Sequence, residues 1–426
     1  MGRVSSVSRR DVLRTLSLGG AAAALAGGGV LTRPQRAQAA ETITPYDIYR
    51  KYFDPKPLFT VSGKKPLLMV TDRPPNLETP LKYLTTQITP NDVFFLRGRL
   101  LDPTNVDATA FRLKVAGEVT TELSLSLHDL KTQFEQVNLM AVNQCSGNSL
   151  AFLDPPASIG WPLGHGFMGC AVWTGVRVRD LLKKAGIKGS ARDVVFRGMD
   201  RPVFQKGPIY EKALPTPNIH PRLDVDQTLN PDILLAYEMN GEPVPHWNGY
   251  PLRLVIPAVY GTYWVKWVES LTVLPNVYDG FWQRGYAYTV PTRLIPPGGP
   301  APVSIMVPIS TFNVKSVITS PDDSATLRVN EPIEIKGVAF DGGVGIKEVH
   351  VSFDGGQNWH EARLGRDMGK YAWRLWTYPF PPRQAGKYTV MARAVNLRGE
   401  SQPMDPAWMP QGYMYNAVDA INLYVA

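Results

Sequence analysis

The sequence predicts an α+β fold with a mixed β-sheet core, followed by a smaller domain built almost entirely of strands. Three observations support this prediction. Short apolar or alternating runs mix with a few helical ones between residues 91 and 290, whereas residues 315–426 contain strand patterns alone. A proline-rich stretch separates the two regions. The length of 426 residues also exceeds what one hydrophobic core usually organises.

The composition excludes several classes of protein. Hydrophobic residues make up 44% of the chain and charged residues 19%, which excludes a disordered or acidic-tail protein. The 37 glycines and 38 prolines follow no fixed period, so a collagen is excluded and a loop-rich, strand-rich globular protein is favoured. Two cysteines cannot build a disulfide framework or a four-thiolate metal site, and leave one disulfide or one reactive thiolate at most.

Residues 1–39 are typical of a twin-arginine signal peptide. Arg9 and Arg10 precede a weakly apolar stretch that contains five glycines, and Ala37-Gln38-Ala39 is a small-x-small cleavage site. A membrane anchor, the alternative, is disfavoured because the stretch is too short and too rich in glycine to span a bilayer. We therefore expect a periplasmic protein without a membrane span, whose cofactor is inserted before export.

The formal net charge of +8 is concentrated in this signal peptide. It holds six arginines and one aspartate, which account for five of the charges and leave about +3 on the rest of the chain. That value is ordinary for a globular protein, so we expect no nucleic-acid partner.

The elements of the first domain follow in chain order. Residues 41–90 are polar and proline-studded, which predicts a segment that leads into the domain rather than a core. Thr174 has the position of a helix cap, and the helix that it begins is expected to end at Gly186. Alternating or apolar runs predict strands at residues 111–115, 137–142, 193–196, 233–237 and 252–256. This mixture predicts an α+β domain with buried sheets.

The second domain begins after a break. Residues 291–314 are rich in proline and contain two adjacent glycines, which predicts a linker. Beyond it, apolar and polar residues alternate around residues 333–335, 349–353 and 388–392, and Asp354-Gly355-Gly356 is a turn signal. Short strands at this spacing predict an immunoglobulin-like β-sandwich over residues 315–426.

The candidate chemistry centres on Cys145. The six histidines are scattered, and the sequence has no His-x-x-x-His pair, P-loop, dinucleotide-binding glycine motif or Gly-x-Ser-x-Gly elbow. Cys145 follows an apolar strand and opens the turn Cys145-Ser146-Gly147-Asn148, whose small residues let a large group approach the sulfur. From these residues alone, an inert buried thiol remains the alternative. Cys170 fits that alternative better, and the expected compartment also permits a disulfide between the two cysteines.

The turn at Cys145 resembles the cysteine loop of the sulfite oxidase family of molybdenum enzymes. Further segments match the family in order between about residues 85 and 420. They include Asp92-Val93-Phe94-Phe95-Leu96-Arg97, Trp173-Thr174-Gly175, Ala236-Tyr237-Glu238-Met239-Asn240-Gly241, Gly249-Tyr250-Pro251-Leu252-Arg253, Trp264-Val265-Lys266-Trp267 and Ala372-Trp373-Arg374-Leu375-Trp376. The resemblance implies a sulfite oxidase-type molybdopterin domain at residues 91–290 and a dimerisation domain at residues 315–426. We expect no haem in this chain, as in bacterial sulfite dehydrogenases.

The same resemblance implies roles for individual residues. Cys145 would be the thiolate ligand of molybdenum, since a metal held by a pterin dithiolene accepts a further soft ligand. Arg97 would steer the anion and stabilise the oxygen that is transferred. Tyr288, with Tyr286 as the reserve, would hydrogen-bond near the metal. The contacts expected to bind the molybdenum–molybdopterin cofactor are Arg97, Arg99, Cys145, Asp200, Asn248, Arg253, Trp264, Val265 and Lys266.

The resemblance also implies a reaction and its partners. Oxygen-atom transfer would convert sulfite and water to sulfate, with two electrons passing from the substrate to the metal. Because we expect no second redox centre in this chain, the electrons would leave one at a time to a c-type cytochrome. A homodimer through the second domain is expected from the same comparison.

The sequence departs from the family pattern in the anion pocket. Sulfite-oxidising members carry further arginines where this chain has Ser149-Leu150 and Gln411-Gly412-Tyr413. A doubly charged anion beside one arginine rather than three is poorly compensated. Two alternatives therefore stay open: the same cofactor acting on a less anionic or bulkier sulfur compound, and a non-catalytic periplasmic scaffold or binding protein.

Overall fold

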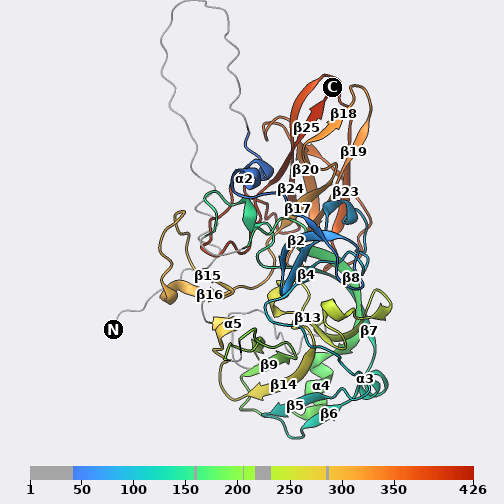
Figure 1. Cartoon of the computed structure of the whole chain (residues 1–426), viewed down its shortest axis with the longest axis vertical. Coiled ribbons are helices and arrows are strands. Elements are labelled where there is room, and N and C mark those ends of the chain that lie inside the picture. Colours follow the sequence, from blue (N-terminus) through green and yellow to red (C-terminus); the bar gives the residue numbers. More distant parts are fainter. Residues whose placement is uncertain (1–41, 158–160, 205, 216–231, 285–286) are drawn as a thin grey trace, which may run out of the picture. The chain divides into compact units, whose positions relative to one another are not determined.

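The computed structural model describes residues 42–157, 161–204, 206–215, 232–284 and 287–426 (Figure 1). Residues Ile43–Ala426 form one compact unit. The expected signal peptide and the reserve residue Tyr286 therefore lie outside the described residues. Within the described ranges, no helix has both the length and the apolarity needed to cross a membrane.

The segment that leads into the first domain has a structure of its own. Helix α2 (Pro45–Tyr52) begins at Thr44, whose hydroxyl accepts a hydrogen bond from the Asp47 amide in a capping box. An antiparallel sheet follows, made of β1 (Leu58–Phe59), β2 (Leu67–Asp72), β3 (Pro75–Glu78) and β4 (Leu96–Arg97). The polar composition of this segment concealed a small buried core of Leu67, Leu77, Val93 and Leu96.

A mixed five-stranded sheet begins the larger part of the first domain. Its order is β10 (Glu211–Pro215), β9 (Asp193–Gly198), β14 (Val268–Leu274), β5 (Leu113–Gly117) and β6 (Leu123–Leu125). Strands β14 and β5 are parallel, while the other neighbours are antiparallel. Helix α3 (Leu127–Gln133) follows β6 from a second capping box at Ser126. The mixed sheet predicted for this domain is therefore confirmed.

A second five-stranded sheet carries the cysteine turn. Its order is β12 (Glu242–Pro243), β11 (Leu234–Met239), β8 (Met168–Arg177) and β7 (Val137–Gln144), with β13 (Arg253–Val255) paired to β11. Buried apolar residues dominate β8 and β11, as a sheet covered on both faces requires. Strand β7 ends at Gln144, so it positions Cys145 at its end. All five strand ranges predicted for this domain overlap an observed strand.

The helix predicted to follow a cap at Thr174 begins three residues later than expected, because its cap is Arg177. Residues Thr174 to Arg177 continue β8 and pair with β7 or β11, and the Thr174 hydroxyl donates to the Asn138 side chain at 2.7 Å. Helix α4 (Val178–Ala185) therefore starts after Arg177 without a side-chain cap. Its predicted end is confirmed, because Gly186 adopts φ +71° and closes the last turn through hydrogen bonds to Leu182 and Lys183.

The proline-rich stretch folds back on itself. Strands β15 (Thr289–Pro291) and β16 (Met306–Pro308) pair as an antiparallel ladder, and helix α5 (Phe281–Arg284) precedes them. Short 3-10 helices connect several of the strands: η2 (Leu81–Tyr83), η3 (Leu150–Phe152), η4 (His246–Asn248), η5 (Gly261–Tyr263) and η6 (Val303–Ile305). The β15–β16 pair fixes the neighbouring Tyr288, which is 4% exposed.

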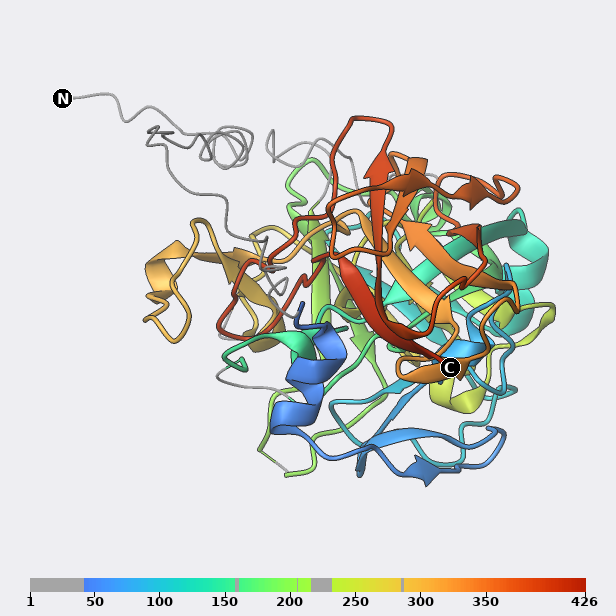
Figure 2. The ribbon, with the colours of Figure 1, turned by 90° about the horizontal axis from the view of Figure 1, so that it is seen from above.

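Residues 315–426 form two sheets around one core. One sheet contains β17 (Lys315–Ser320), β19 (Ile333–Phe340), β23 (Arg374–Phe380) and β22 (Arg363–Leu364), and the other β18 (Ala325–Leu327), β25 (Asp419–Val425), β24 (Gly386–Asn396), β20 (Ile346–Ser352) and β21 (His360–Glu361). Ile335, Val349, Trp376 and Val390 pack together in that core. Figure 2 shows these orange-to-red strands together, with helix α2 (blue) beside β25. The described chain is mostly strand, with few and short helices.

Candidate functional site

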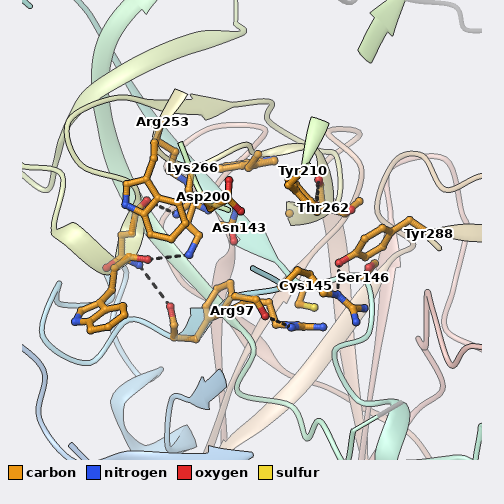
Figure 3. A pocket seen from close by; sticks show the side chains of 18 residues that line it. Arg97, Asn143, Cys145, Ser146, Asp200, Tyr210, Arg253, Thr262, Lys266 and Tyr288 are labelled. Carbon is orange, nitrogen blue, oxygen red and sulfur yellow. Dashed lines mark hydrogen bonds between the residues drawn. The ribbon is translucent and has the colours of Figure 1, made fainter. Parts of the chain in front are cut away.

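One cavity brings together segments that are far apart in the sequence. Its lining includes Arg97, Arg99, Asn143, Cys145, Ser146, Asp200, Asn248, Arg253, Trp264, Lys266 and Tyr288. Figure 3 shows Cys145 and Ser146 in the region of Arg97 and Tyr288, while Arg253, Lys266 and Asp200 gather on the other side. The cavity therefore has a thiol side and a side rich in cations.

Cys145 is the cysteine that reaches this cavity. It lies at the end of β7, is 8% exposed, and its amide donates to the Phe167 carbonyl at 2.9 Å. Cys170 is completely buried on the neighbouring strand β8, where burial raises the pKa of its thiol to about 12. Both cysteines are free thiols, so the disulfide alternative is wrong and Cys170 is the inert core residue.

Hydrogen bonds hold the cysteine turn in one conformation. The Asn148 amide donates to the Cys145 carbonyl at 3.0 Å, and the Asn148 side chain accepts from the Phe167 amide at 3.1 Å. Behind the turn, the chain approaches so closely at Gly166 that a Cβ there would lie 2.0 Å from the Thr79 carbonyl oxygen. Only glycine fits that position. The sulfur is therefore presented by a rigid backbone.

The cationic side is built from residues that the sequence assigned to cofactor binding. Arg253 on β13 is 5% exposed and donates to the Asn248 carbonyl at 2.6 Å. Its guanidinium lies over the rings of Trp173 and Trp264, at 5.2 and 5.8 Å from their centroids. Lys64, from the segment that leads into the domain, donates to the Asn248 side chain at 2.8 Å. Sequence reasoning missed Lys64 because the segment that leads into the domain contains no motif that indicates a binding residue.

Burial shifts the charges on this side strongly. Desolvation alone lowers the pKa of Arg253 to about 9. Mainly through burial, with the Arg253 charge acting in the same direction and the Asp92 charge opposing it, the pKa of Lys64 falls to about 7. Burial also lowers the pKa of Lys266, with Arg253 acting in the same direction and Asp200 opposing it. The pKa of Asp200 is raised by its own burial. Three cations beside one carboxyl group leave a buried surplus of positive charge that calls for an anionic ligand.

On the thiol side, two arginines and one tyrosine line the cavity. Arg97 on β4 donates to the Asn76 side chain at 2.6 Å and lies over the Trp161 ring at 4.8 Å. Arg99 donates through Nε to the Tyr288 hydroxyl at 2.8 Å, the bond drawn at Tyr288 in Figure 3. The resemblance implied that Arg99 contacts the phosphate or the pterin of the cofactor. The structure places Arg99 beside Tyr288, in the cavity that Cys145 also lines.

Tyr288 has two further neighbours that sequence reasoning missed. Its ring stacks on Tyr413 from the second domain at a centroid distance of 5.4 Å. Lys212 on β10 is 1% exposed, and its ammonium lies 4.5 Å from the Tyr288 centroid and donates to the Trp282 carbonyl. Burial, together with the charge of Arg99, lowers the pKa of Lys212. A single lysine in an unremarkable strand gives no sequence signal of this position.

The two places that lack family arginines contact each other. Leu150 is 6% exposed, and a Cβ on Gly412 would lie 2.6 Å from its Cβ. A Cβ on Gly147 would lie 3.0 Å from the end of the same leucine side chain. Leu150 and Gly412 therefore form an apolar surface, called the apolar wall below, at the edge of the cysteine turn. The family pattern predicted cations at these positions.

The residues present fit a molybdopterin cofactor. Four buried polar atoms at the cavity have no hydrogen-bond partner within the described protein: Arg97 Nε, Asn143 Nδ2, Ser146 Oγ and Arg253 Nε. Unpaired buried donors are costly, and a pterin with its phosphate supplies acceptors and negative charge. No group of three or more His, Cys, Asp or Glu side chains is placed to hold a metal ion in the described chain. One thiolate suits a metal whose other ligands come from the cofactor.

The remaining predicted contacts differ in position. Trp264 is 2% exposed and lines the cavity, and its indole donates to the Val259 carbonyl at 3.0 Å. Val265 is buried but is not among the described lining residues, so its side chain supports the site from behind. Its backbone still fixes the segment that carries Trp264 and Lys266, because the Leu254 amide donates to the Val265 carbonyl at 2.8 Å and the Val265 amide donates to the Tyr263 carbonyl at 3.0 Å.

Comparison with known proteins agrees with this geometry. The chain matches the oxidoreductase molybdopterin binding domain over residues 100–282 and the Mo-co oxidoreductase dimerisation domain over residues 306–425. Human mitochondrial sulfite oxidase is 33% identical over 384 residues, which cover 85% of this chain and 67% of that protein. Sulfite oxidase of Arabidopsis thaliana is 30% identical, covering 82% of this chain and 92% of that protein.

A solved structure gives the same result for the fold. The sulfane dehydrogenase of Paracoccus pantotrophus superposes with a TM-score of 0.69 at 22% identity, covering 93% of this chain and 96% of that one. At that identity the likeness shows the fold alone. With the domain matches, the relatives above 30% identity and a cavity suited to the pterin, the chain belongs to the sulfite oxidase family and is a molybdopterin-dependent oxidoreductase.

Proposed function

We propose that the protein oxidises sulfite to sulfate. The observation that supports this proposal is the pair of guanidinium groups, Arg97 and Arg99, on the Cys145 side of the cavity. Two fixed cations compensate a doubly charged anion better than the single arginine that the sequence comparison placed there. The human and Arabidopsis relatives, both named as sulfite oxidases, support the same substrate.

The protein side of the reaction is binding, orientation and charge compensation. Sulfite and water give sulfate, two protons and two electrons, and the bound molybdenum cofactor supplies the oxygen-atom transfer and accepts the electrons. Arg97 and Arg99 hold the anionic oxygens, because preorganised donors in a dry pocket stabilise charge strongly. Tyr288 is held by Arg99 and donates its hydroxyl proton toward the substrate oxygens. The Trp161 ring shields both arginines from water.

The cellular setting completes the proposal. The twin-arginine pattern at residues 1–39 supports export to the periplasm, where a c-type cytochrome takes the electrons one at a time. The match to a dimerisation domain supports a homodimer through residues 306–425. Two sheets around one core, with short strands, support an immunoglobulin-like sandwich for this region.

A second candidate follows from the apolar wall of Leu150 and Gly412. This wall and the Tyr413 ring favour a less anionic sulfur compound on the same cofactor, because apolar surface costs less to bury than an uncompensated charge. The two candidates share the cofactor and differ in the charge of the substrate.

An assay with purified, molybdenum-loaded protein tests the proposal. We expect two molecules of cytochrome c reduced per sulfite consumed, with sulfate as the product, and a weaker response to an uncharged organic sulfide. Fast turnover of the sulfide with slow turnover of sulfite supports the second candidate. A protein that binds about one molybdenum per chain but reduces cytochrome c with neither compound contradicts both.

Arg253→Met separates cofactor binding from folding. We expect molybdenum content to fall, since loss of a supporting contact to a metal cofactor typically costs about 10- to 100-fold in affinity. The cofactor-free variant should melt no lower than cofactor-free wild type, because the substitution removes a buried cation that burial disfavours. Metal analysis and thermal melting measure the two effects. Arg112→Met, at an exposed residue immediately before β5, is the control.

A further inference from the structure

Four buried polar side chains form a chain behind the cysteine turn, outside the cavity. Ser149 and His165 belong to the first domain, while Lys315 on β17 and Asp419 on β25 belong to the second. Each of the four is at most 2% exposed. Ser149 Oγ lies 2.7 Å from both Lys315 Nζ and His165 Nδ1, and His165 Nε2 lies 3.0 Å from Asp419 Oδ1.

Hydrogen bonds join these groups in series. The Lys315 ammonium donates to Ser149 Oγ, and Ser149 Oγ shares a second hydrogen bond with His165 Nδ1, in which the histidine tautomer determines the donor. On its other side, His165 Nε2 lies 3.0 Å from Asp419 Oδ1, an ion-pair distance at which neither atom makes a hydrogen bond of regular geometry. Close polar contacts therefore connect Lys315 through Ser149 and His165 to Asp419.

Burying a lysine and an aspartate in this arrangement costs desolvation free energy, which opposes folding. Burial lowers the pKa of Lys315 to about 7, against an opposing effect of the Asp419 charge. Buried ion pairs are often no more stabilising than well-packed apolar residues of the same volume. Stability alone therefore does not account for a lysine and an aspartate at this place, whereas a requirement for one fixed geometry does.

The geometry that the chain fixes is that of the cysteine turn. Ser149 lies four residues after Cys145 and adopts φ +75°, an unfavourable left-handed conformation for a residue with a side chain. Its amide donates to the Gly164 carbonyl at 2.8 Å. From the second domain, the Met414 amide donates to the Ser146 carbonyl at 2.9 Å, and Lys315 also donates to the Tyr415 carbonyl at 3.2 Å. Lys315 thus contacts both segments that hold the turn.

We propose that Lys315 and Asp419 are positioning residues that act through Ser149 and His165, so that the second domain sets the orientation of the Cys145 sulfur. The inference rests on the proposed role of Cys145 as the metal ligand. The inference gives the second domain a role inside its own protomer, in addition to the dimer contact implied by the name of its family.

Hydrogen–deuterium exchange of the full-length, molybdenum-loaded protein tests the positioning directly. In Lys315→Met we expect the amides of residues 148–152 to exchange about tenfold faster, the equivalent of one lost charge-assisted hydrogen bond. The control is Lys336→Met, a half-exposed lysine on β19 of the same domain, which should leave that exchange unchanged. Equal exchange in Lys315→Met and wild type contradicts the proposal.

A charge-balanced variant separates positioning from a simple ion pair. Lys315→Met with Asp419→Asn removes both charges, so folding should recover while exchange in residues 148–152 stays fast. Recovery of wild-type exchange in this double variant overturns the proposal. Ser149→Ala breaks the chain without removing a charge and should give the same fast exchange, which keeps the test decisive if Lys315→Met alone fails to fold.

Absorption and kinetics supply the functional readout. We expect the thiolate-to-molybdenum absorption band to shift in Lys315→Met, and kcat to fall about 10- to 100-fold with little change in KM, as for other residues that orient metal ligands. An unchanged band contradicts the proposal. Because exchange and absorption need no substrate, they judge the positioning role even if sulfite is not oxidised, an outcome that counts against the proposed function alone.

Discussion

Cys145→Ser is expected to lower the rate of sulfite oxidation by more than about 100-fold, since even residues that only support metal ligands contribute 10- to 100-fold. A serine hydroxyl is a hard, protonated group and a poor replacement for a soft thiolate at molybdenum. The thiolate-to-molybdenum absorption band should disappear with the activity. The fold should survive, because the turn is held by backbone and Asn148 hydrogen bonds that do not involve the sulfur.

Cys170→Ser provides the matched control for that variant. It places a hydroxyl in a completely buried apolar site, so we expect a loss of about 1–3 kcal/mol of unfolding free energy. Its absorption band and its turnover at a temperature below the melting transition should equal those of wild type. If Cys145→Ser keeps the band and the turnover, Cys145 is not the metal ligand and the assignment of the site is wrong.

Arg99→Gln is expected to reduce kcat/KM for sulfite by about 10²–10³, the typical effect of removing one preorganised donor from a dry site. The substitution removes a cation from the thiol side and also the hydrogen bond that holds Tyr288. Steady-state kinetics over a range of sulfite concentrations measures the loss. Molybdenum content should equal that of wild type, because Arg99 contacts Tyr288, whereas Arg253 and Lys266 supply the cations that we expect to bind the cofactor.

Metal content decides between the two roles considered for Arg99. The resemblance implied a contact with the phosphate or the pterin of the cofactor, and that role predicts that Arg99→Gln loses molybdenum together with activity. Arg363→Gln, on the exposed strand β22, controls for the change of net charge. Normal molybdenum content with normal sulfite kinetics would exclude both roles.

Local patterns predicted much of the fold because they depend on residues close in sequence. The apolar runs at residues 137–142 and 233–237 became β7 and β11, and Gly186 ended α4 as expected. The predicted start of α4 was wrong. Thr174 has the local pattern of a helix cap, but pairing with β7 and β11 extends strand β8 through Thr174. That pairing partner lies about 60 residues away for β11 and is invisible to local reasoning.

The site was predictable to the extent that motifs carried it. Cys145, Asp200, Arg253 and Lys266 lie in one cavity, as the order of the matching segments led us to expect. Lys64, Lys212 and Lys315 were missed because each is a single lysine whose importance comes from burial beside distant residues. Burial of a charge is a property of the whole fold, so no pattern of neighbours along the chain reveals it.

The position of the cavity determines which residues a shortened version of the protein must keep. The matched molybdopterin-binding region spans residues 100–282, yet Lys64, Arg97, Arg99 and Tyr288 all lie outside it. A polypeptide trimmed to those limits would lack both guanidinium groups of the thiol side and Tyr288, whose hydroxyl accepts a hydrogen bond from Arg99. A fragment designed to keep the complete site should therefore include the residues from α2 through the β15–β16 ladder. It should also include the sheets that follow the ladder, because Tyr413, which stacks on Tyr288, lies between their strands β24 and β25.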